Sequence, residues 1–127
     1  MNHKIVFVLN ALLTLSFGVP AYFVPAEVFT TFGLTLDAGG QVVTRGYAIT
    51  CVGYGLAMLA VRGVTEIAVV RGLLLATVVF NLGEVILQTQ AGLAGTVGAM
   101  VWGTCASHAA LGLLGFVQIL RTKKNGG

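Results

Sequence analysis

Charged residues are scarce in this chain of 127 residues. Only 9% of the residues are Asp, Glu, Lys or Arg, whereas 57% are hydrophobic and the mean hydropathy is +0.95. Soluble domains carry about 25% charged residues, so this chain lacks the polar surface that water requires. The length suits one compact domain over residues 1–127. We therefore expect a membrane protein whose main surroundings are the lipid bilayer.

Motifs of catalysis, metal binding and disulfide bonding are also lacking. The two cysteines, Cys51 and Cys105, lie within apolar runs, which is not the pattern of a disulfide framework. The sequence contains no glycine-rich phosphate loop, no His-Glu-x-x-His segment and no nucleophile with a spaced base. Basic residues are not interleaved with aromatic ones, so nucleic-acid binding is not indicated. These absences argue against an enzyme and name no cofactor.

Long apolar runs, by contrast, are abundant. Each is close to or above the roughly 20 residues that a helix needs to cross the hydrocarbon core. The runs cover residues 5–24, 42–61, 67–87 and 93–120. The segments between them are a loop over 25–41 and short polar turns over 62–66 and 88–92. This pattern predicts an all-α membrane protein, an antiparallel bundle of four transmembrane helices.

The basic residues predict the orientation of the bundle. Arg45 falls on one side of the four-span topology together with the acidic residues Glu27 and Asp37. The other basic residues fall on the opposite side; they are Lys4, Arg62, Arg71, Arg121, Lys123 and Lys124. Because cytoplasmic loops carry an excess of Lys and Arg, both termini are expected in the cytoplasm and loop 25–41 outside.

Small residues mark helix faces that can approach closely. In lipid, helices associate through close packing of small side chains. One such stripe runs along the fourth span and comprises Gly95, Ala99, Gly103, Ala106 and Ala110. We expect this stripe in the core of the bundle, with a seam between two copies as the alternative.

A polar row follows the third span, at Thr77, Asn81, Glu84 and Gln88. These positions share one helix face and should point inward, because an ionisable group in the bilayer is costly. Arg45 opens the second span at the same predicted depth, so an ion pair between Arg45 and Glu84 is one hypothesis. Alternatively, Arg45 reaches lipid phosphates while Glu84 is protonated or bound to water.

His108 lies near the middle of the fourth span. It is either a hydrogen-bonded packing residue or a ligand-contacting one. Cys105, three residues earlier, makes a weak metal candidate with it, since one pair does not complete a coordination shell. His108, Asn81 and Glu84 could form a proton relay or hold the polar end of a quinone-like molecule or lipid. Tyr54 and Trp102 either line such a pocket or serve packing.

The order of features resembles DoxX-like proteins, small bacterial four-helix membrane proteins of unknown function. The matching segments are Phe23-Val24-Pro25-Ala26-Glu27-Val28-Phe29, Phe32-Gly33-Leu34, Thr44-Arg45-Gly46-Tyr47-Ala48 and Gly53-x-Gly55, with Glu84 as the late polar residue of the third span. The resemblance implies a four-helix fold in the bacterial inner membrane. It carries no catalytic residues, and His108 lies outside the matched pattern.

Two classes of function remain open from the sequence. The first is a non-enzymatic protein, either an accessory or scaffold subunit that packs against other membrane-protein subunits or itself, or a binder of lipid or another hydrophobic ligand. The second is a proton-coupled redox or transport component that uses a buried cluster of Glu84, Asn81 and His108. The candidate site residues for both are Arg45, Tyr54, Asn81, Glu84 and His108.

Overall fold

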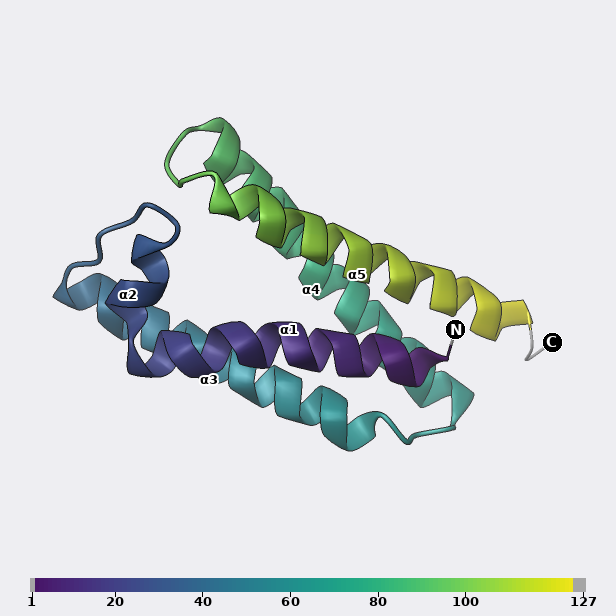
Figure 1. Ribbon diagram of the computed structural model, residues 1–127. Coiled ribbons are helices and arrows are strands. Elements are labelled where there is room, and N and C mark those ends of the chain that lie inside the picture. Colours follow the sequence, from purple (N-terminus) through teal and green to yellow (C-terminus); the bar gives the residue numbers. More distant parts are fainter. Residues whose placement is uncertain (1, 125–127) are drawn as a thin grey trace.

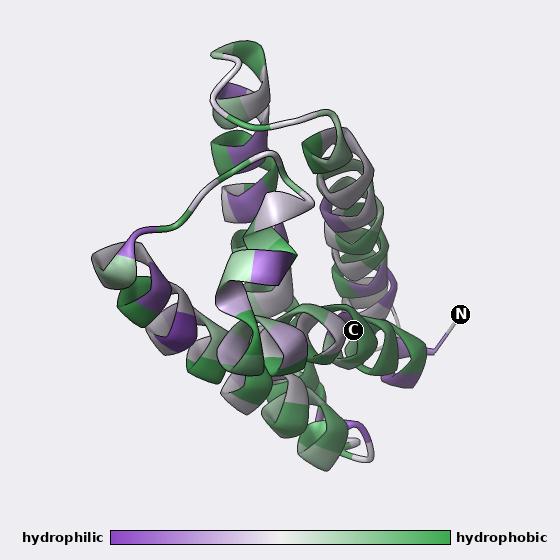
Figure 2. Ribbon diagram, turned by 60° about the vertical axis from the view of Figure 1, so that its left-hand side comes forward, coloured by the Kyte–Doolittle hydropathy of each residue, from purple (hydrophilic) through white to green (hydrophobic). Residues whose placement is uncertain are grey.

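The structure is a computed structural model that describes residues 2–124, and all regular secondary structure in that range is helical. The helices are α1 (His3–Phe23), the short α2 (Pro25–Thr30), α3 (Ala38–Val61), α4 (Ile67–Leu93) and α5 (Met100–Lys124) (Figure 1). The four long ones are each long and apolar enough to cross a membrane. Apolar residues predominate along them in Figure 2. The predicted all-α class with four candidate spans is confirmed.

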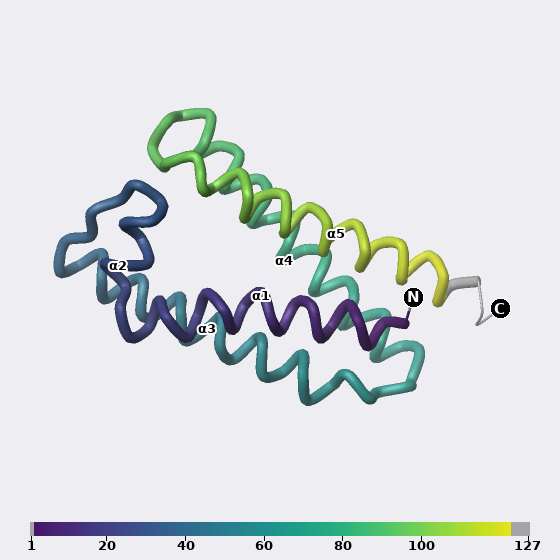
Figure 3. The backbone as a smooth tube through the Cα atoms, viewed as in Figure 1, coloured from purple at the N-terminus to yellow at the C-terminus, as the bar shows by residue number. Residues whose placement is uncertain are grey.

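The long helices are arranged as two pairs. α1 packs along α3, and α4 packs along α5. α3 and α4 are joined by the short turn over 62–66, yet within the described residues their backbones do not approach each other closely. The backbone of α1 makes the close approach between the two pairs, whereas α3 and α4 meet through side chains. Figures 1 and 3 show the pairs meeting where α1 begins and α5 ends, and diverging toward α2. We call these the terminal end and the α2 end.

A buried apolar cluster holds the terminal end together. Its members come from α1, α3 and α4; they are Val6, Phe7, Ala11, Met58, Val70 and Leu74. Most are fully inaccessible, so the two pairs are in close contact here. His3 adds a polar tie, since its Nε2 lies 3.0 Å from the carbonyl oxygen of Val64 in the α3–α4 turn.

Glycines bring the two helices of each pair together. A Cβ atom on Gly18 of α1 would lie 2.9 Å from the carbonyl oxygen of Ala48 on α3, and one on Gly115 of α5 would lie 3.1 Å from Val78 on α4. Only glycine allows backbones to approach this closely without displacement. The tightest packing is therefore within the pairs rather than between them.

The predicted small-residue core stripe of α5 is wrong. Gly103, Ala106 and Ala110 are exposed, and Gly95 and Ala99 precede the helix. The buried face of α5 instead carries larger residues, namely Val101, Cys105, His108 and Leu111. Small side chains alone do not show which face of a helix points inward in lipid, because a small residue on the outward face costs no free energy there.

Two boundaries also differ from the sequence prediction. α4 continues through the predicted turn at 88–92 and ends at Leu93, so the connection to α5 lies at 94–99. Gly95 (φ +67°) makes this turn, while the amides of Gly95 and Thr96 donate to the carbonyls of Gly92 and Ala91. α3 begins earlier than predicted, at Ala38, because the Asp37 carboxylate caps it by accepting from the Gly40 amide.

The connections bring the pairs together again at the α2 end. The Gly98 amide, in the loop between α4 and α5, donates to the carbonyl oxygen of Phe32, in the loop after α2 (2.6 Å). The apolar segment 28–34 packs inward through Phe29, whose ring centroid lies 6.2 Å from that of Phe17 on α1. α2 and the two loops therefore cover the space between the diverging pairs.

Candidate functional site

Asn81 on α4 is the centre of a buried polar cluster where the two pairs meet. Its amide nitrogen donates to the side-chain oxygen of Asn10 on α1 (2.7 Å) and to the carbonyl oxygen of Thr77 (2.8 Å). Its side-chain oxygen lies 2.8 Å from Nδ1 of His108 on α5. Asn10 and Asn81 are fully buried, and His108 is 9% exposed. We call Asn10, Asn81 and His108 the vertex cluster.

The amide orientation of Asn81 assigns the protonation of His108. Because the Asn81 nitrogen serves Asn10 and Thr77, its oxygen must be the atom facing the ring, so Nδ1 of His108 is the donor. In the neutral ring, Nε2 is then an acceptor. Tyr54 borders the cluster, because its hydroxyl donates to Thr77 (3.1 Å), one turn before Asn81.

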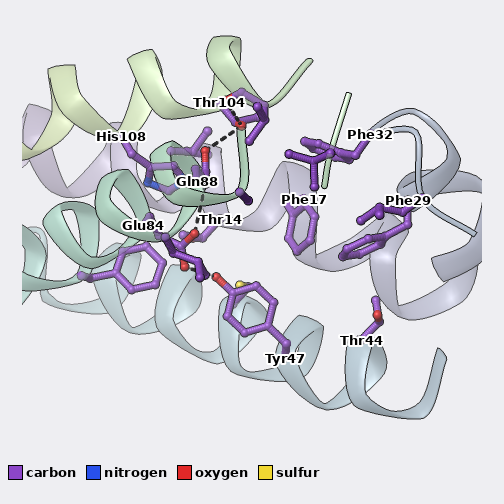
Figure 4. Close-up of a pocket in the computed structure, with 18 of the residues that line it drawn as sticks. Thr14, Phe17, Phe29, Phe32, Thr44, Tyr47, Glu84, Gln88, Thr104 and His108 are labelled. Atoms are coloured by element: carbon purple, nitrogen blue, oxygen red, sulfur yellow. Dashed lines mark hydrogen bonds between the residues drawn. The ribbon is translucent and has the colours of Figure 1, made fainter. Parts of the chain in front are cut away.

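A second polar network crosses from α3 to α5 on the side of α2. The Tyr47 hydroxyl donates to Oε1 of Glu84 (2.5 Å), and Nε2 of Gln88 donates to Oε2 of Glu84 (3.0 Å). The Thr104 hydroxyl donates to the side-chain oxygen of Gln88 (2.8 Å), which leaves the amide nitrogen of Gln88 for Glu84. We call Tyr47, Glu84, Gln88 and Thr104 the carboxylate network; Figure 4 shows its hydrogen bonds.

The hypothesised ion pair between Arg45 and Glu84 is not formed. Nε of Arg45 donates instead to the carbonyl oxygen of Tyr22, at the end of α1 (3.2 Å). Arg45 and Tyr47 are two positions apart, which places them about 200° apart around the helix. Since Tyr47 faces Glu84, Arg45 faces away from it. Glu84 also lies deeper than predicted, about 13 Å before the end of α4, because that helix continues to Leu93.

The carboxylate network forms one wall of a cavity of about 440 Å³ between the two helix pairs. Binding sites for small molecules have volumes of about 300–1,000 Å³ and combine apolar walls with a few polar groups. The polar lining residues are Thr14, Thr44, Tyr47, Glu84, Gln88, Thr104 and His108; Cys51 also lines it. His108, which Figure 4 shows among the lining residues, therefore belongs both to the vertex cluster and to the cavity wall.

Aromatic side chains form the part of the cavity nearest to α2. The ring centroid of Phe17 lies 6.2 Å from that of Phe29 and 5.9 Å from that of Tyr47, and the Phe29 and Phe32 centroids are 6.0 Å apart. Phe80 adds a ring near the vertex cluster, 5.9 Å from His108. Figure 4 shows Phe17 between Phe29 and Tyr47. Apolar residues complete the wall, among them Leu13, Val43, Leu87, Val97 and Val101.

Two further sequence candidates lie outside the cavity wall. Tyr54 stacks on Phe80 with ring centroids 4.9 Å apart, behind the lining residues. Trp102 packs on Gly92, where an added Cβ would meet its ring at 2.7 Å. Tyr54 thus packs behind the lining residue Phe80, and Trp102 packs between α4 and α5.

The weak metal candidates Cys105 and His108 are not brought to one point. Cys105 contacts the Thr89 hydroxyl (3.5 Å) and the Val85 carbonyl oxygen (3.9 Å), whereas His108 contacts Asn81. Within the described residues, no group of three or more His, Cys, Asp or Glu side chains could hold a metal ion.

The sequence predicted one cluster of Asn81, Glu84 and His108. The structure joins Asn81 to His108, whereas Glu84 lies in the carboxylate network and shares the cavity wall with His108. The predicted inward orientation of Thr77 and Asn81 is confirmed. Sequence reasoning missed Tyr47, Thr104 and the aromatic wall as site residues. A usable signal was the spacing of Tyr47, Cys51 and Tyr54, which places a polar face on α3 opposite the polar row of α4.

Comparisons with family models, curated proteins and solved structures found no match for this chain. The resemblance to DoxX-like proteins therefore stays a prediction.

Proposed function

We propose that this protein binds an amphiphilic, largely hydrophobic molecule in the cavity between its two helix pairs. The observation that supports this most is the cavity itself, about 440 Å³ of mainly apolar space with one carboxylate network in its wall. An apolar body would fit against the aromatic and aliphatic lining. A polar group would fit at Glu84, Gln88 and Thr104.

As part of the same proposal, we adopt the membrane location and orientation that the sequence predicts. The protein is placed in the bacterial inner membrane with both termini cytoplasmic, so that the α2 end faces outward. The ligand would then enter from the outer leaflet or the space beyond it. The resemblance to DoxX-like proteins supports this placement.

Filling the cavity tests the proposal. Ala91 lines the cavity on α4, whereas Ala76 lies on the exposed face of the same helix. Ala91→Phe is expected to abolish retention of hydrophobic molecules that native mass spectrometry detects in protein released from mild non-ionic detergent, and Ala76→Phe is expected to keep it. A wild-type protein that carries no molecule and binds no added amphiphile would contradict the proposal.

A proton-coupled redox role with a quinone-like ligand is the second candidate. One observation favours it: His108 lines the cavity while its Nδ1 is held by Asn81, so Nε2 is left as an acceptor for a hydroxyl proton. A bound quinone would show a redox-dependent ultraviolet absorption that disappears in His108→Leu. An accessory or scaffold role stays open through the exposed small residues of α5.

A further inference from the structure

We infer that the amphiphile bound in the cavity carries a positive charge, such as a long-chain ammonium group. This inference rests on the proposed function and specifies its ligand class. It is carried by the position of the Glu84 carboxylate beside a group of aromatic rings, in the wall of a cavity whose described lining residues include no lysine or arginine.

The charge of the cavity is the first step. Within the described residues that line it, Glu84 is the one carboxylate, and there is no Lys or Arg. Both oxygens of Glu84 accept hydrogen bonds, one from the Tyr47 hydroxyl and one from the Gln88 amide, and both donors are neutral. A carboxylate at membrane depth requires a partner, and neutral donors supply no opposite charge.

The protein's own cations do not supply that charge. Arg45, the basic residue of the α2 end, donates to the carbonyl oxygen of Tyr22 at the end of α1 and faces away from Glu84. His108 also lines the cavity, but it is bonded to Asn81, and the hydrogen bonds of Glu84 within the described residues come from Tyr47 and Gln88. The site of a compensating cation is therefore the cavity itself, which faces Glu84.

The aromatic rings are the second, independent observation. Aromatic faces attract cations through the ring quadrupole, and groups of rings are used to bind quaternary ammonium ligands. Phe17, Phe29 and Tyr47 form such a group, with centroid separations of 6.2 and 5.9 Å about Phe17. Tyr47 links the two features, since its hydroxyl bonds Glu84 while its ring contacts Phe17.

The surroundings of the cavity agree with this charge. The α2 end carries two exposed acids, Glu27 on α2 and Asp37 at the start of α3, against Arg45 as the basic residue of that end. An excess of negative charge around an opening raises the local concentration of cations. A cationic amphiphile is thus favoured both at the α2 end and at the cavity wall.

The test compares a cation with its neutral isostere. Binding of dodecyltrimethylammonium, and of an analogue in which carbon replaces the nitrogen, is measured on the full-length protein in non-ionic detergent. We expect the wild type to prefer the cation by about tenfold or more, as one desolvated cation–π contact and a carboxylate suggest. Glu84→Gln should lose most of this preference, whereas Glu66→Gln, at an exposed acid of the terminal end, should keep it.

A second variant keeps the inference testable if Glu84→Gln does not fold. Phe17→Leu keeps apolar volume and removes the central ring, so it should reduce the preference for the cation several-fold while the neutral probe still binds. The control is Phe23→Leu, at an outward position that is 72% exposed. Equal binding of both probes by the wild type would overturn the inference and leave the proposed function intact. If the wild type bound neither probe, the inference would fail, and the Ala91→Phe experiment would judge the proposed function separately.

Discussion

The vertex cluster and the carboxylate network are built from similar polar side chains, less than one helix length apart, yet they differ in what surrounds them. At the vertex, Asn10 and Asn81 are fully buried, and each amide has protein partners. At the carboxylate network, Glu84 is only partly buried and borders a cavity of about 440 Å³. The vertex joins the two helix pairs, and the network lines the space that their divergence opens.

The difference separates a structural role from a binding role. A closed hydrogen-bond network without a formal charge stabilises one arrangement of helices, because any separation leaves buried groups unpaired. A carboxylate facing a cavity gains more from a bound partner than from the fold. Substitutions in the vertex cluster should therefore mainly lower stability, whereas substitutions in the carboxylate network should mainly weaken ligand binding.

The largest effect on stability is expected at the vertex. Asn81→Ala removes three hydrogen bonds and leaves Asn10 and His108 without that partner, so the free energy of unfolding should fall by about 2 kcal/mol. Reversible unfolding in mixed micelles measures this, with Leu82→Ala, at a 55% exposed neighbouring position, as the control. A loss no greater than that of the control would show that the vertex does not hold the pairs together.

The carboxylate network should show a much smaller effect in the same assay. Tyr47→Phe keeps the ring and removes one partly exposed hydrogen bond, which in membrane proteins contributes about 0.6 kcal/mol on average. The unfolding free energy should thus change little, while the preference for the cationic probe weakens because Glu84 loses one of its two donors. A destabilisation as large as that of Asn81→Ala would make the network structural.

The smallest effect is expected where the two loops meet over the cavity. A Cβ on Gly98 would lie 3.2 Å from the Phe32 carbonyl oxygen, so Gly98→Ala should loosen the one hydrogen bond that joins these loops within the described residues. Because loosening costs only part of the about 1 kcal/mol that such a bond contributes, bound amphiphile should dissociate about twofold faster. Stopped-flow displacement measures the rate, and Gly63→Ala, with open space around its Cβ position, should leave it unchanged.

Much of the fold could be predicted from the sequence, because helix length and hydropathy report directly on the hydrocarbon thickness. The inward face of α4 was also predictable, since Thr77, Asn81, Glu84 and Gln88 repeat with the period of a helix. The end of α4 was misplaced because polar residues at 88–90 indicated a turn, whereas Gln88 is used within the helix to bond Glu84 and Thr104.

The candidate site was less predictable, because it depends on how helices are paired rather than on their individual patterns. Equal depth suggested Arg45 as the partner of Glu84, but the rotation of α3 presents Tyr47 instead. The cavity depends on the divergence of the two pairs, which no local pattern encodes. Likewise, the exposed Gly103 and Ala106 could not be distinguished by size from the packed Gly112 and Gly115.

The lack of backbone contact between α3 and α4 has a consequence for biogenesis. The α1–α3 pair is complete once residue 61 has been synthesised, and the α4–α5 pair contains its own tight contacts, so each can enter the bilayer as a self-sufficient hairpin. Joining the hairpins is then a separate, later step, sealed by the bond between Asn10 and Asn81 across 71 positions of the chain. The cavity forms only at that step. A chain whose two hairpins are inserted but not yet joined would therefore be unable to bind the proposed ligand.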